Sequence, residues 1–304
     1  MLRPLLAPLW APLLAALLLV TSSAAVAAPP PAPAVRFAVI KTAALPVQEA
    51  LLFAGGRLGH PAVTNFSAFL IQHGDSRFLF DTGLGSQVAQ QYAQDMPLWM
   101  RPFFKYEDPV LPVRQQLAQA GVPTVTDIYL SHDHWDHASG LVDFPGAAVW
   151  VTPQERVHAR ESQGRPGGAW PSQVGSPSIQ WRTVTLQPVP YEGFESSLDL
   201  YGDDRVVLVP LKGHTPGSVG LFVRVSSGPR YFFVGDAVWS AQALKEGRPK
   251  FWPARQIVDD DVARTQQVID RIRAAMARDP ALVVVPAHDG AVQDVLGYFP
   301  KWVE

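Results

Sequence analysis

The sequence predicts a layered α/β fold in a single domain. Segments rich in Val, Ile and Phe, cut by Gly, Pro and Asp, recur in both halves of the chain and are typical of strands. Segments with helical periodicity fall between and after them, which favours layers of helices and sheets over an all-β barrel. With 304 residues and 47% hydrophobic side chains, the chain is long enough to bury a sizeable core.

The predicted elements follow one another closely. In the first half, strands are predicted for residues 35–40, 49–54, 63–72, 77–80, 127–130 and 147–151. Helices are predicted for residues 113–120, which are followed by Gly121, and for residues 153–161, which begin with Pro. In the second half, strands are predicted for residues 205–210, 219–225, 231–234 and 282–285, and one long helix with an acidic start for residues 259–277.

Two stretches break this pattern. Residues 87–109 combine Gln and Pro with aromatic side chains, which is too irregular for a core element and too apolar for a simple linker. A lid or pocket wall is one interpretation, and burial of the rings under a loop is the other. Residues 164–177 are rich in Gly and Pro and predict a surface insertion.

Residues 1–27 have the pattern of a signal peptide. Arg3 precedes an apolar stretch at 5–20, and small residues end the segment at Ala27. An uncleaved membrane anchor is the alternative, but the apolar stretch is shorter than a spanning helix and contains two Pro. After cleavage we expect a disordered Pro-rich lead-in at 28–34, a folded domain at 35–304, no stable membrane association and a periplasmic or secreted location.

Charge and cysteine content exclude several classes of function. The formal net charge is −2 and no run of Lys or Arg occurs after the predicted signal peptide, so we expect no nucleic acid as a partner. The chain has no Cys, which excludes disulfides, thiolate metal ligands and Cys nucleophiles.

The strongest chemical signal is a cluster of histidines directly after a predicted strand. Residues 131–137 have the sequence Ser-His-Asp-His-Trp-Asp-His, with three of the eight histidines. A chain of this composition would contain His-x-His-x-Asp-His by chance at a frequency on the order of a few in ten thousand. His132 and His134 lie two residues apart in extended geometry, so both imidazoles can bind one ion. Asp136 and His137 then turn toward another ion.

Three further ligand candidates each follow a strand-like segment. They are His214 in Gly-His, Asp236 in Gly-Asp and His288 in Ala-His. We expect the strand ends to converge on one rim, where these side chains supply the missing ligands. Neutral imidazoles and carboxylates suit zinc and related first-row ions, whereas calcium and magnesium prefer oxygen ligands alone. The sequence therefore predicts a metal site, with Zn²⁺ as the first choice.

The order of these motifs resembles that of the metallo-β-lactamase superfamily, in which a His-x-His-x-Asp-His loop is followed by Gly-His, Gly-Asp and a final His. The resemblance covers residues 66–289. It includes Phe-Asp-Thr-Gly at 80–83 and Gly-His-Thr-Pro-Gly-Ser at 213–218, both habitual in that family. It implies a four-layer αββα sandwich with the metal ions at one edge, so that residues 35–304 would form a metallo-hydrolase domain.

The resemblance also implies a role for each candidate residue. His132, His134 and His214 would hold one divalent ion, Asp136, His137 and His288 a second, and Asp236 would bridge the two. Asp81 would hold the ligand loop from outside the ligand set. Two close cations would lower the pKa of a bridging water and polarise the scissile bond of the substrate. Asp136 is the first candidate for proton transfer to the leaving group, and Asp236 is the second.

These expectations define an exported metal-dependent hydrolase of small-molecule lactones or esters, similar to acyl-homoserine lactonases. The absence of Cys and the presence of Asp236 resemble lactonases, phosphotriesterases, glyoxalase II and ribonuclease Z more than antibiotic-degrading lactamases. Export argues against the glutathione and transfer-RNA pathways, and the acidic charge argues against a nuclease. Acyl-homoserine lactonases often carry Tyr three residues after the bridging Asp, where this chain has Trp239, whose indole donates a hydrogen bond but transfers no proton.

Other functions stay open at this point. They are a phosphotriester hydrolase, a β-lactamase, a metal-binding protein without activity, and an iron enzyme that reduces oxygen or persulfide. The remaining histidines (His60, His73 and His158) are expected at the surface, and Asp133 is expected to point away from the ions. Four tryptophans (Trp135, Trp170, Trp181 and Trp252) are expected to serve packing.

Overall fold

The computed structural model of the protein describes residues 33–304, which form one compact unit. The predicted signal peptide at 1–27 and most of the predicted lead-in at 28–34 lie outside the described residues. Both therefore stay predictions. Within 33–304, no helix has the length and apolar character that a membrane crossing requires.

The first sheet joins a long N-terminal hairpin to a row of parallel strands. In spatial order its strands are β1 (Val35–Gln48), β2 (Pro61–His73), β3 (Ser76–Phe80), β4 (Asp127–Tyr129), β5 (Ala148–Val151) and β6 (Gln180–Thr183). The first three strands pair antiparallel, and β3 to β6 pair in parallel. The carboxyl ends of the parallel strands therefore meet at one edge, which is where the ligand candidates follow β4.

The second sheet comes from the C-terminal half of the chain. In spatial order its strands are β11 (Val283–Val285), β10 (Arg230–Phe233), β9 (Val219–Arg224), β8 (Val206–Pro210) and β7 (Leu198–Asp199). The pair β10 and β11 is parallel, and the other pairs are antiparallel.

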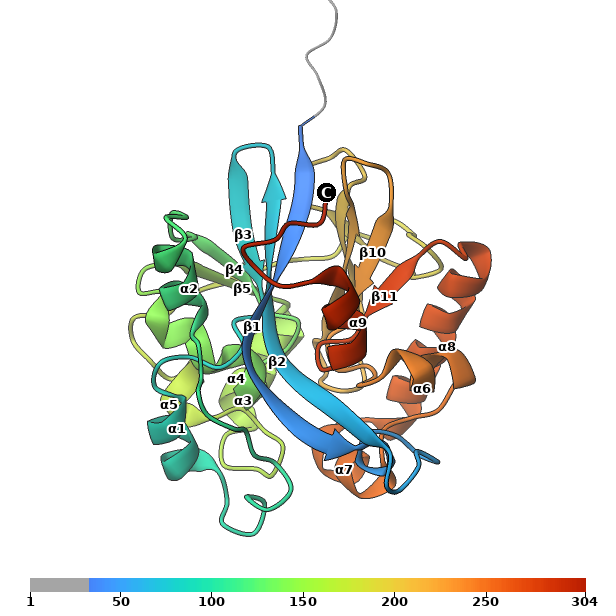
Figure 1. The fold of residues 1–304 in the computed structure, drawn as a ribbon. Coiled ribbons are helices and arrows are strands. Elements are labelled where there is room, and N and C mark those ends of the chain that lie inside the picture. Colours follow the sequence, from blue (N-terminus) through green and yellow to red (C-terminus); the bar gives the residue numbers. More distant parts are fainter. Residues whose placement is uncertain (1–32) are drawn as a thin grey trace, which may run out of the picture. The chain divides into compact units, whose positions relative to one another are not determined.

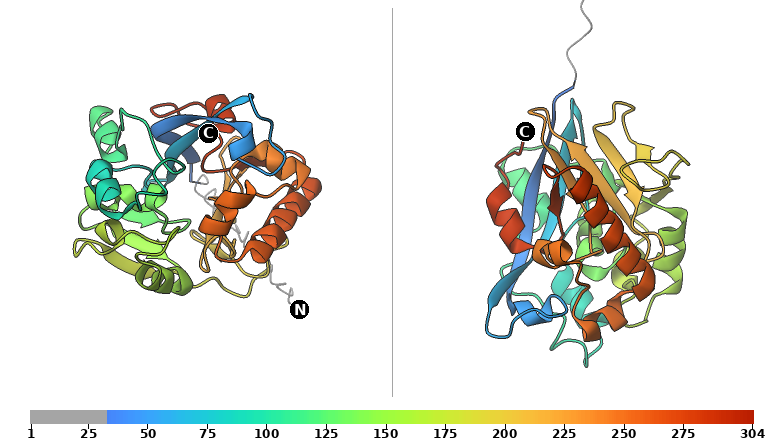
Figure 2. Two further views of the ribbon diagram at one scale, coloured as in Figure 1. Left: turned by 90° about the horizontal axis from the view of Figure 1, so that it is seen from below. Right: turned by 90° about the vertical axis from the view of Figure 1, so that its right-hand side faces the viewer.

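Helices cover the outer face of each sheet, as Figures 1 and 2 show. On the first sheet lie α1 (Val88–Asp95), α2 (Val113–Gln119), α3 (Trp135–Ala138), η2 (Ser139–Asp143), α4 (Pro153–Glu161) and α5 (Pro171–Val174). On the second lie α6 (Ala241–Glu246) and α8 (Val262–Arg278), while α7 (Trp252–Val258) crosses the lower end in Figure 1 and α9 (Gly290–Leu296) packs on the N-terminal hairpin. The predicted αββα sandwich is thereby confirmed.

The inner faces of the two sheets meet in an aromatic core. The Phe233 ring on β10 lies 4.5 Å from that of Phe69 and 5.0 Å from that of Phe37, and all three are almost completely buried. Two further apolar clusters join each sheet to its own helices. This packing sets the distance between the sheet edges that carry the metal ligands.

Three predictions for individual segments are wrong. Residues 49–54 are not a strand but the turn of the hairpin, with the short 3₁₀ helix η1 (Glu49–Leu51), because the Glu49 carboxylate accepts hydrogen bonds from Arg57 across that turn. Residues 87–109 contain the regular helix α1. Residues 164–177 are no plain surface insertion, since Trp170 and the helix α5 are partly buried against α1. The helices α6, α7 and α9 and the strands β6 and β7 were not predicted.

Candidate metal centre

The ligand loop, residues 131–137, changes conformation half-way along, and this divides its four ligand candidates into two pairs. It leaves β4 in extended geometry, and His134 still has a ψ of 157°. The single helical turn α3 follows, in which the His137 backbone N–H donates to the His134 carbonyl. His132 and His134 therefore occupy the extended part, and Asp136 and His137 the helical part.

The seven predicted ligands lie together and form two groups around Asp236. The histidine group consists of His132, His134 and His214, whose candidate ligand atoms lie within 4.8 Å of one another. The Asp136 group consists of Asp136, His137 and His288, whose candidate ligand atoms also lie within 4.8 Å of one another. All seven are at most 9% exposed.

Asp236 lies between the two groups and faces both. Its Oδ1 is 3.2 Å from Nε2 of His137 and 3.1 Å from Nε2 of His288, both in the Asp136 group. Its Oδ2 is 3.7 Å from Nε2 of His214, in the histidine group. Each oxygen of Asp236 therefore faces a different group, which is the position that the resemblance implies for a bridging ligand.

Acceptors outside the two groups hold Nδ1 of four imidazoles. They are Asp81 for His137, Asp259 for His214, the Asn65 carbonyl for His288 and the Ser131 hydroxyl for His132, at 2.7 to 2.9 Å. The Ser131 hydroxyl gives its own hydrogen to Asp81, so it accepts from His132. A neutral imidazole with its hydrogen on Nδ1 carries a lone pair on Nε2. The Nε2 atoms of all four rings therefore face the centre, and each can offer a lone pair to a cation when its ring is neutral.

The residues of the centre fit divalent cations. Within 33–304, Nε2 of His134, Nε2 of His137 and Oδ1 of Asp236 are buried without a hydrogen-bond partner, although nitrogen and oxygen atoms lie nearby. Nε2 of His132 and Nε2 of His214 lie 3.1 Å apart. A buried polar atom without a partner costs about 1–3 kcal/mol, and cations bound in the two groups would supply partners for these atoms. Imidazole and carboxylate ligands in these numbers suit zinc.

The electrostatics differ between the two groups. Burial and the neighbouring imidazoles lower the pKa of His132 and of His134 well below the usual range, which keeps both rings neutral. Burial also acts to lower the pKa of His288, but Asp236 and Asp136 outweigh it and raise that pKa to about 10. A cation that binds beside His288 would therefore displace a proton.

Asp81 holds the ligand loop, as the resemblance implied. Its Oδ1 accepts from the Ser131 backbone N–H at 2.7 Å, and its Oδ2 accepts from the Ser131 hydroxyl and from Nδ1 of His137. Asp81 has a φ of 61°, in the left-handed region that Asp tolerates better than most residues. The conformation turns the carboxylate under the loop.

Glu155, which the sequence analysis missed, ties the ligand loop to the loop of His214. Its Oε1 accepts from the Asp133 backbone N–H at 2.8 Å, and its Oε2 accepts from the Thr215 hydroxyl at 2.7 Å and the Gly217 N–H at 3.0 Å. Thr152 caps α4 by accepting from the Glu155 N–H. Thr-x-x-Glu at a helix start is a capping-box pattern and was the available signal, but here the Glu side chain turns to the site.

The prediction that His158 lies at the surface is wrong. Its ring is buried, with Nδ1 2.9 Å from an oxygen of Asp133. Asp133 does turn away from the metal ligands, and a buried carboxylate needs such a partner. His73 is buried as well, 2.7 Å from Asp203, and Trp252 is 64% exposed rather than packed.

Trp239 donates its indole hydrogen to the metal centre itself. Nε1 lies 2.7 Å from Oδ2 of Asp236, the carboxylate between the two groups. The ring stands edge-on to His288, with 6.3 Å between centroids. Trp239 therefore orients Asp236 instead of presenting a free donor to a substrate.

Two aromatic side chains of the stretch 87–109 pack against Trp135 of the ligand loop. Trp135, within that loop, stacks on Trp170 at 5.2 Å between centroids and lies 6.0 Å from Tyr92 of α1 and 6.4 Å from Tyr106. This packing agrees with burial of the rings under a loop, the other interpretation of the stretch.

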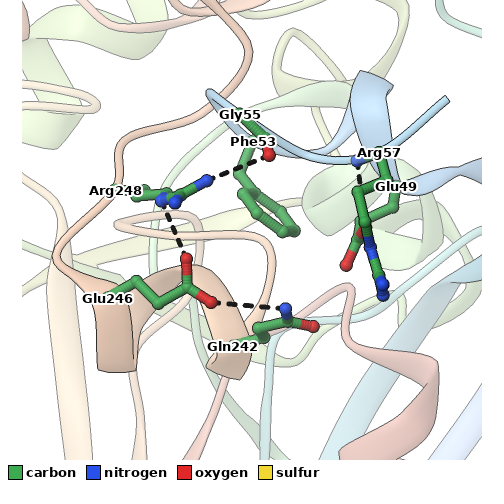
Figure 3. Close-up of a pocket in the computed structure, with 7 residues that line it drawn as sticks. All are labelled: Glu49, Phe53, Gly55, Arg57, Gln242, Glu246 and Arg248. Carbon is green, nitrogen blue, oxygen red and sulfur yellow. Dashed lines mark hydrogen bonds and ion pairs between the residues drawn. The ribbon is translucent and has the colours of Figure 1, made fainter.

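A separate surface pocket of about 270 Å³ lies between η1 and α6 (Figure 3). Its charged side chains pair with one another: Arg248 lies 2.8 Å from Glu246, and Arg57 lies 2.9 Å from Glu49. None of the seven ligand candidates lines it. We therefore place the chemistry at the buried metal centre.

Comparison with known proteins decides the family. A sequence profile described as the metallo-beta-lactamase superfamily matches residues 64–288, which include all seven ligand candidates. The chain belongs to the metallo-β-lactamase superfamily. Its fold and its metal centre are those expected of a metal-dependent hydrolase of this superfamily.

Relatives and solved structures of the superfamily agree with this assignment. The chain is 31% identical over 245 residues to a probable metallo-hydrolase of Mycobacterium tuberculosis, covering 72% of this chain and 73% of that protein. It is 29% identical over 120 residues to the N-acyl homoserine lactonase AttM of Azorhizobium caulinodans, covering 38% of this chain and 43% of that protein.

Two solved structures share the fold at low sequence identity. An N-acyl homoserine lactone hydrolase, with its product N-hexanoyl-L-homoserine at the catalytic metal centre, superposes with a TM-score of 0.66 at 16% identity over 88% of this chain and 98% of that one. The dizinc quorum-quenching lactonase AidC gives a TM-score of 0.59 at 17% identity over 85% and 88%.

Replacing Glu155 with Gln should loosen the connection between the two ligand-bearing loops. The amide NH₂ would face one of the three donors that the carboxylate now accepts, so we expect the free energy of unfolding to fall by about 1–3 kcal/mol. Urea unfolding of the metal-free protein measures this. Glu161→Gln, at an exposed position of the same helix, is the control. Equal stability of both variants would contradict the assigned role.

Proposed function

We propose that the protein is a binuclear hydrolase of lactones or esters, with N-acyl homoserine lactones as the first substrate class to test. The observation that carries the proposal is the position of Asp236 between two ligand groups whose imidazole Nε2 atoms face inward. The similarity to a named N-acyl homoserine lactonase and to structures of such enzymes supports the substrate class. Zn²⁺ is the proposed metal because of the ligand types.

When bound, the cations would supply a water ligand of lowered pKa and polarise the carbonyl or phosphoryl group of the substrate. The side chains of the protein do the rest. The Nδ1 acceptors hold the imidazoles in place, so the rings need no reorientation during the reaction.

Asp136 is better placed than Asp236 to carry the proton to the leaving group. Both oxygens of Asp236 are crowded, since Oδ1 lies 3.2 Å from Nε2 of His137 and 3.1 Å from Nε2 of His288, and Oδ2 accepts from Trp239. The close contact of Asp136 uses only Oδ2, which lies 3.1 Å from Nε2 of His288. Asp136 is also the more exposed of the two carboxylates. These contacts support Asp136 as the general acid.

Phosphotriesters are the second candidate substrate class, and Trp239 is the observation that favours them. Its indole hydrogen is taken by Asp236, so a donor at this position for a lactone carbonyl is missing. A phosphotriester hydrolase would use the same metal centre.

We also propose that the protein is exported, on the strength of the pattern in residues 1–27. The protein recovered from the periplasm or the medium should begin at Ala28, as measured by intact mass. A full-length chain confined to the membrane fraction would instead support the uncleaved anchor.

The zinc-loaded mature protein should hydrolyse acyl-homoserine lactones, and a chelator should abolish the activity until zinc is added back. The panel should also contain simple lactones, aryl esters, phosphotriesters and a cephalosporin. Turnover of phosphotriesters alone would replace the lactone proposal by the second candidate. A protein that binds metal but turns over no member of the panel would contradict the hydrolase proposal.

His134→Ala and Asp236→Ala should each lower kcat/KM by at least about a thousandfold and reduce the bound metal, because each removes a ligand that no neighbour can replace. Metal content by elemental analysis and lactone turnover measure the two effects. His60→Ala and Asp75→Ala, at exposed positions, are the matched controls. Full activity of both ligand variants would refute the assignment of the site.

A further inference from the structure

Lys250 is fully buried directly behind the histidine group. Its Nζ lies 2.6 Å from Oδ1 of Asp259 and 3.3 Å from Nδ1 of His214, and its side chain has no exposed surface. The same Asp259 oxygen accepts from Nδ1 of His214 at 2.7 Å. One carboxylate oxygen therefore receives hydrogens from both a lysine and a metal ligand.

Burying the ammonium group of Lys250 costs free energy that other interactions must offset. An ammonium group removed from water is tolerated only when it is paired and hydrogen-bonded. Asp259 supplies that pairing, with a side chain only 1% exposed. In return, Lys250 supplies the countercharge of a buried carboxylate that must stay in place to orient His214.

A second connection runs from Lys250 to the carboxylate between the two groups. Nζ lies 5.7 Å from the ring centroid of Trp239, within the range of a cation–π interaction. The indole of Trp239 donates to Oδ2 of Asp236 at 2.7 Å. The lysine therefore contacts the supporting residue of His214 and also that of Asp236.

Backbone contacts on either side of Lys250 in the chain fix its position. Lys250 forms a β-bridge with Phe53, at the turn of the N-terminal hairpin. Lys250 precedes helix α7 in the chain and Asp259 follows it, so the ion pair joins the two ends of this helical segment. The next residue, Asp260, donates its backbone N–H to the carbonyl of His214. The ammonium group is thereby fixed relative to the ligand it supports.

We propose that Lys250 is a positioning residue of the metal centre, which holds Asp259 against His214 and so decides how tightly the histidine group binds its cation. The inference rests on the proposed function, because it requires that the centre holds cations. It assigns Lys250 no contact with the substrate. It also predicts the larger effect at the histidine group, because Lys250 lies 2.6 Å from the Asp259 carboxylate but 5.7 Å from the Trp239 ring. A general loss of stability would not favour one group.

The test is Lys250→Met, which keeps the length and apolar stem of the side chain and removes the charge. Metal-free protein is titrated with Zn²⁺ in competition with a chelator, and with Co²⁺ by its visible absorption. We expect the affinity for one ion to fall about 10- to 100-fold, with an altered cobalt spectrum, and the affinity for the other to change less than about threefold. Lys245→Met, at an exposed position of α6, is the matched control and should match the wild type.

Asp259→Asn provides a second route if Lys250→Met does not fold, which urea unfolding of the metal-free proteins reveals. It should weaken the same ion, and the double variant should lose little more than the worse single variant, because the pair acts as one unit. Unchanged affinities in Lys250→Met or Asp259→Asn, or equal weakening of both ions, would overturn the inference. A wild-type protein that binds no divalent cation would instead overturn the proposed function.

Discussion

The metal centre depends on one constraint: buried imidazoles must turn their Nε2 atoms toward one another. Without a cation this arrangement is unfavourable, and Nε2 of His132 and of His214 are only 3.1 Å apart. The fold imposes it by holding the opposite edge of the rings, where Nδ1 donates to a fixed acceptor. Much of the preference for a metal therefore lies in residues that bind no metal themselves.

The residues that accept from Nδ1 belong to different layers of the fold. The geometry of the metal centre therefore depends on how these layers pack. Asp81 follows β3 and Asn65 belongs to β2, both in the first sheet, whereas Asp259 lies between α7 and α8 beside the second. Glu155, at the start of α4, joins the loops that carry His132 and His214. The aromatic packing around Phe233 keeps the two sheets at a fixed separation. A displacement of either sheet would separate imidazoles from their acceptors.

The sequence predicted those parts of the fold whose signals are local. Strands such as β8 and β10 are apolar runs bounded by turn residues, and α4 was predicted with its observed bounds because Pro marks its first turn. Four of the seven ligand candidates were identified because His-x-His-x-Asp-His is improbable by chance, and the other three because each follows a strand-like segment. Residues 49–54 were wrongly predicted as a strand. Their composition is typical of a strand, and it gives no sign of the hydrogen bonds from Arg57 to Glu49 that form the turn. The burial of His158 depends on Asp133, 25 residues away, and no local pattern indicates it.

The acidic run 259–261 shows most clearly what a local interpretation loses. It was predicted as the favourable acidic start of a helix, and Asp261 does cap α8 by accepting from the Arg264 N–H. Yet Asp259 turns back to His214 and Lys250, and the backbone N–H groups of Asp260 and Asp261 donate to the carbonyls of His214 and Gly213. The first residues before α8 thus align the loop of a metal ligand. Because all three positions are bonded to that loop or to the helix, a change in where α8 begins would also move His214 relative to the other ligands.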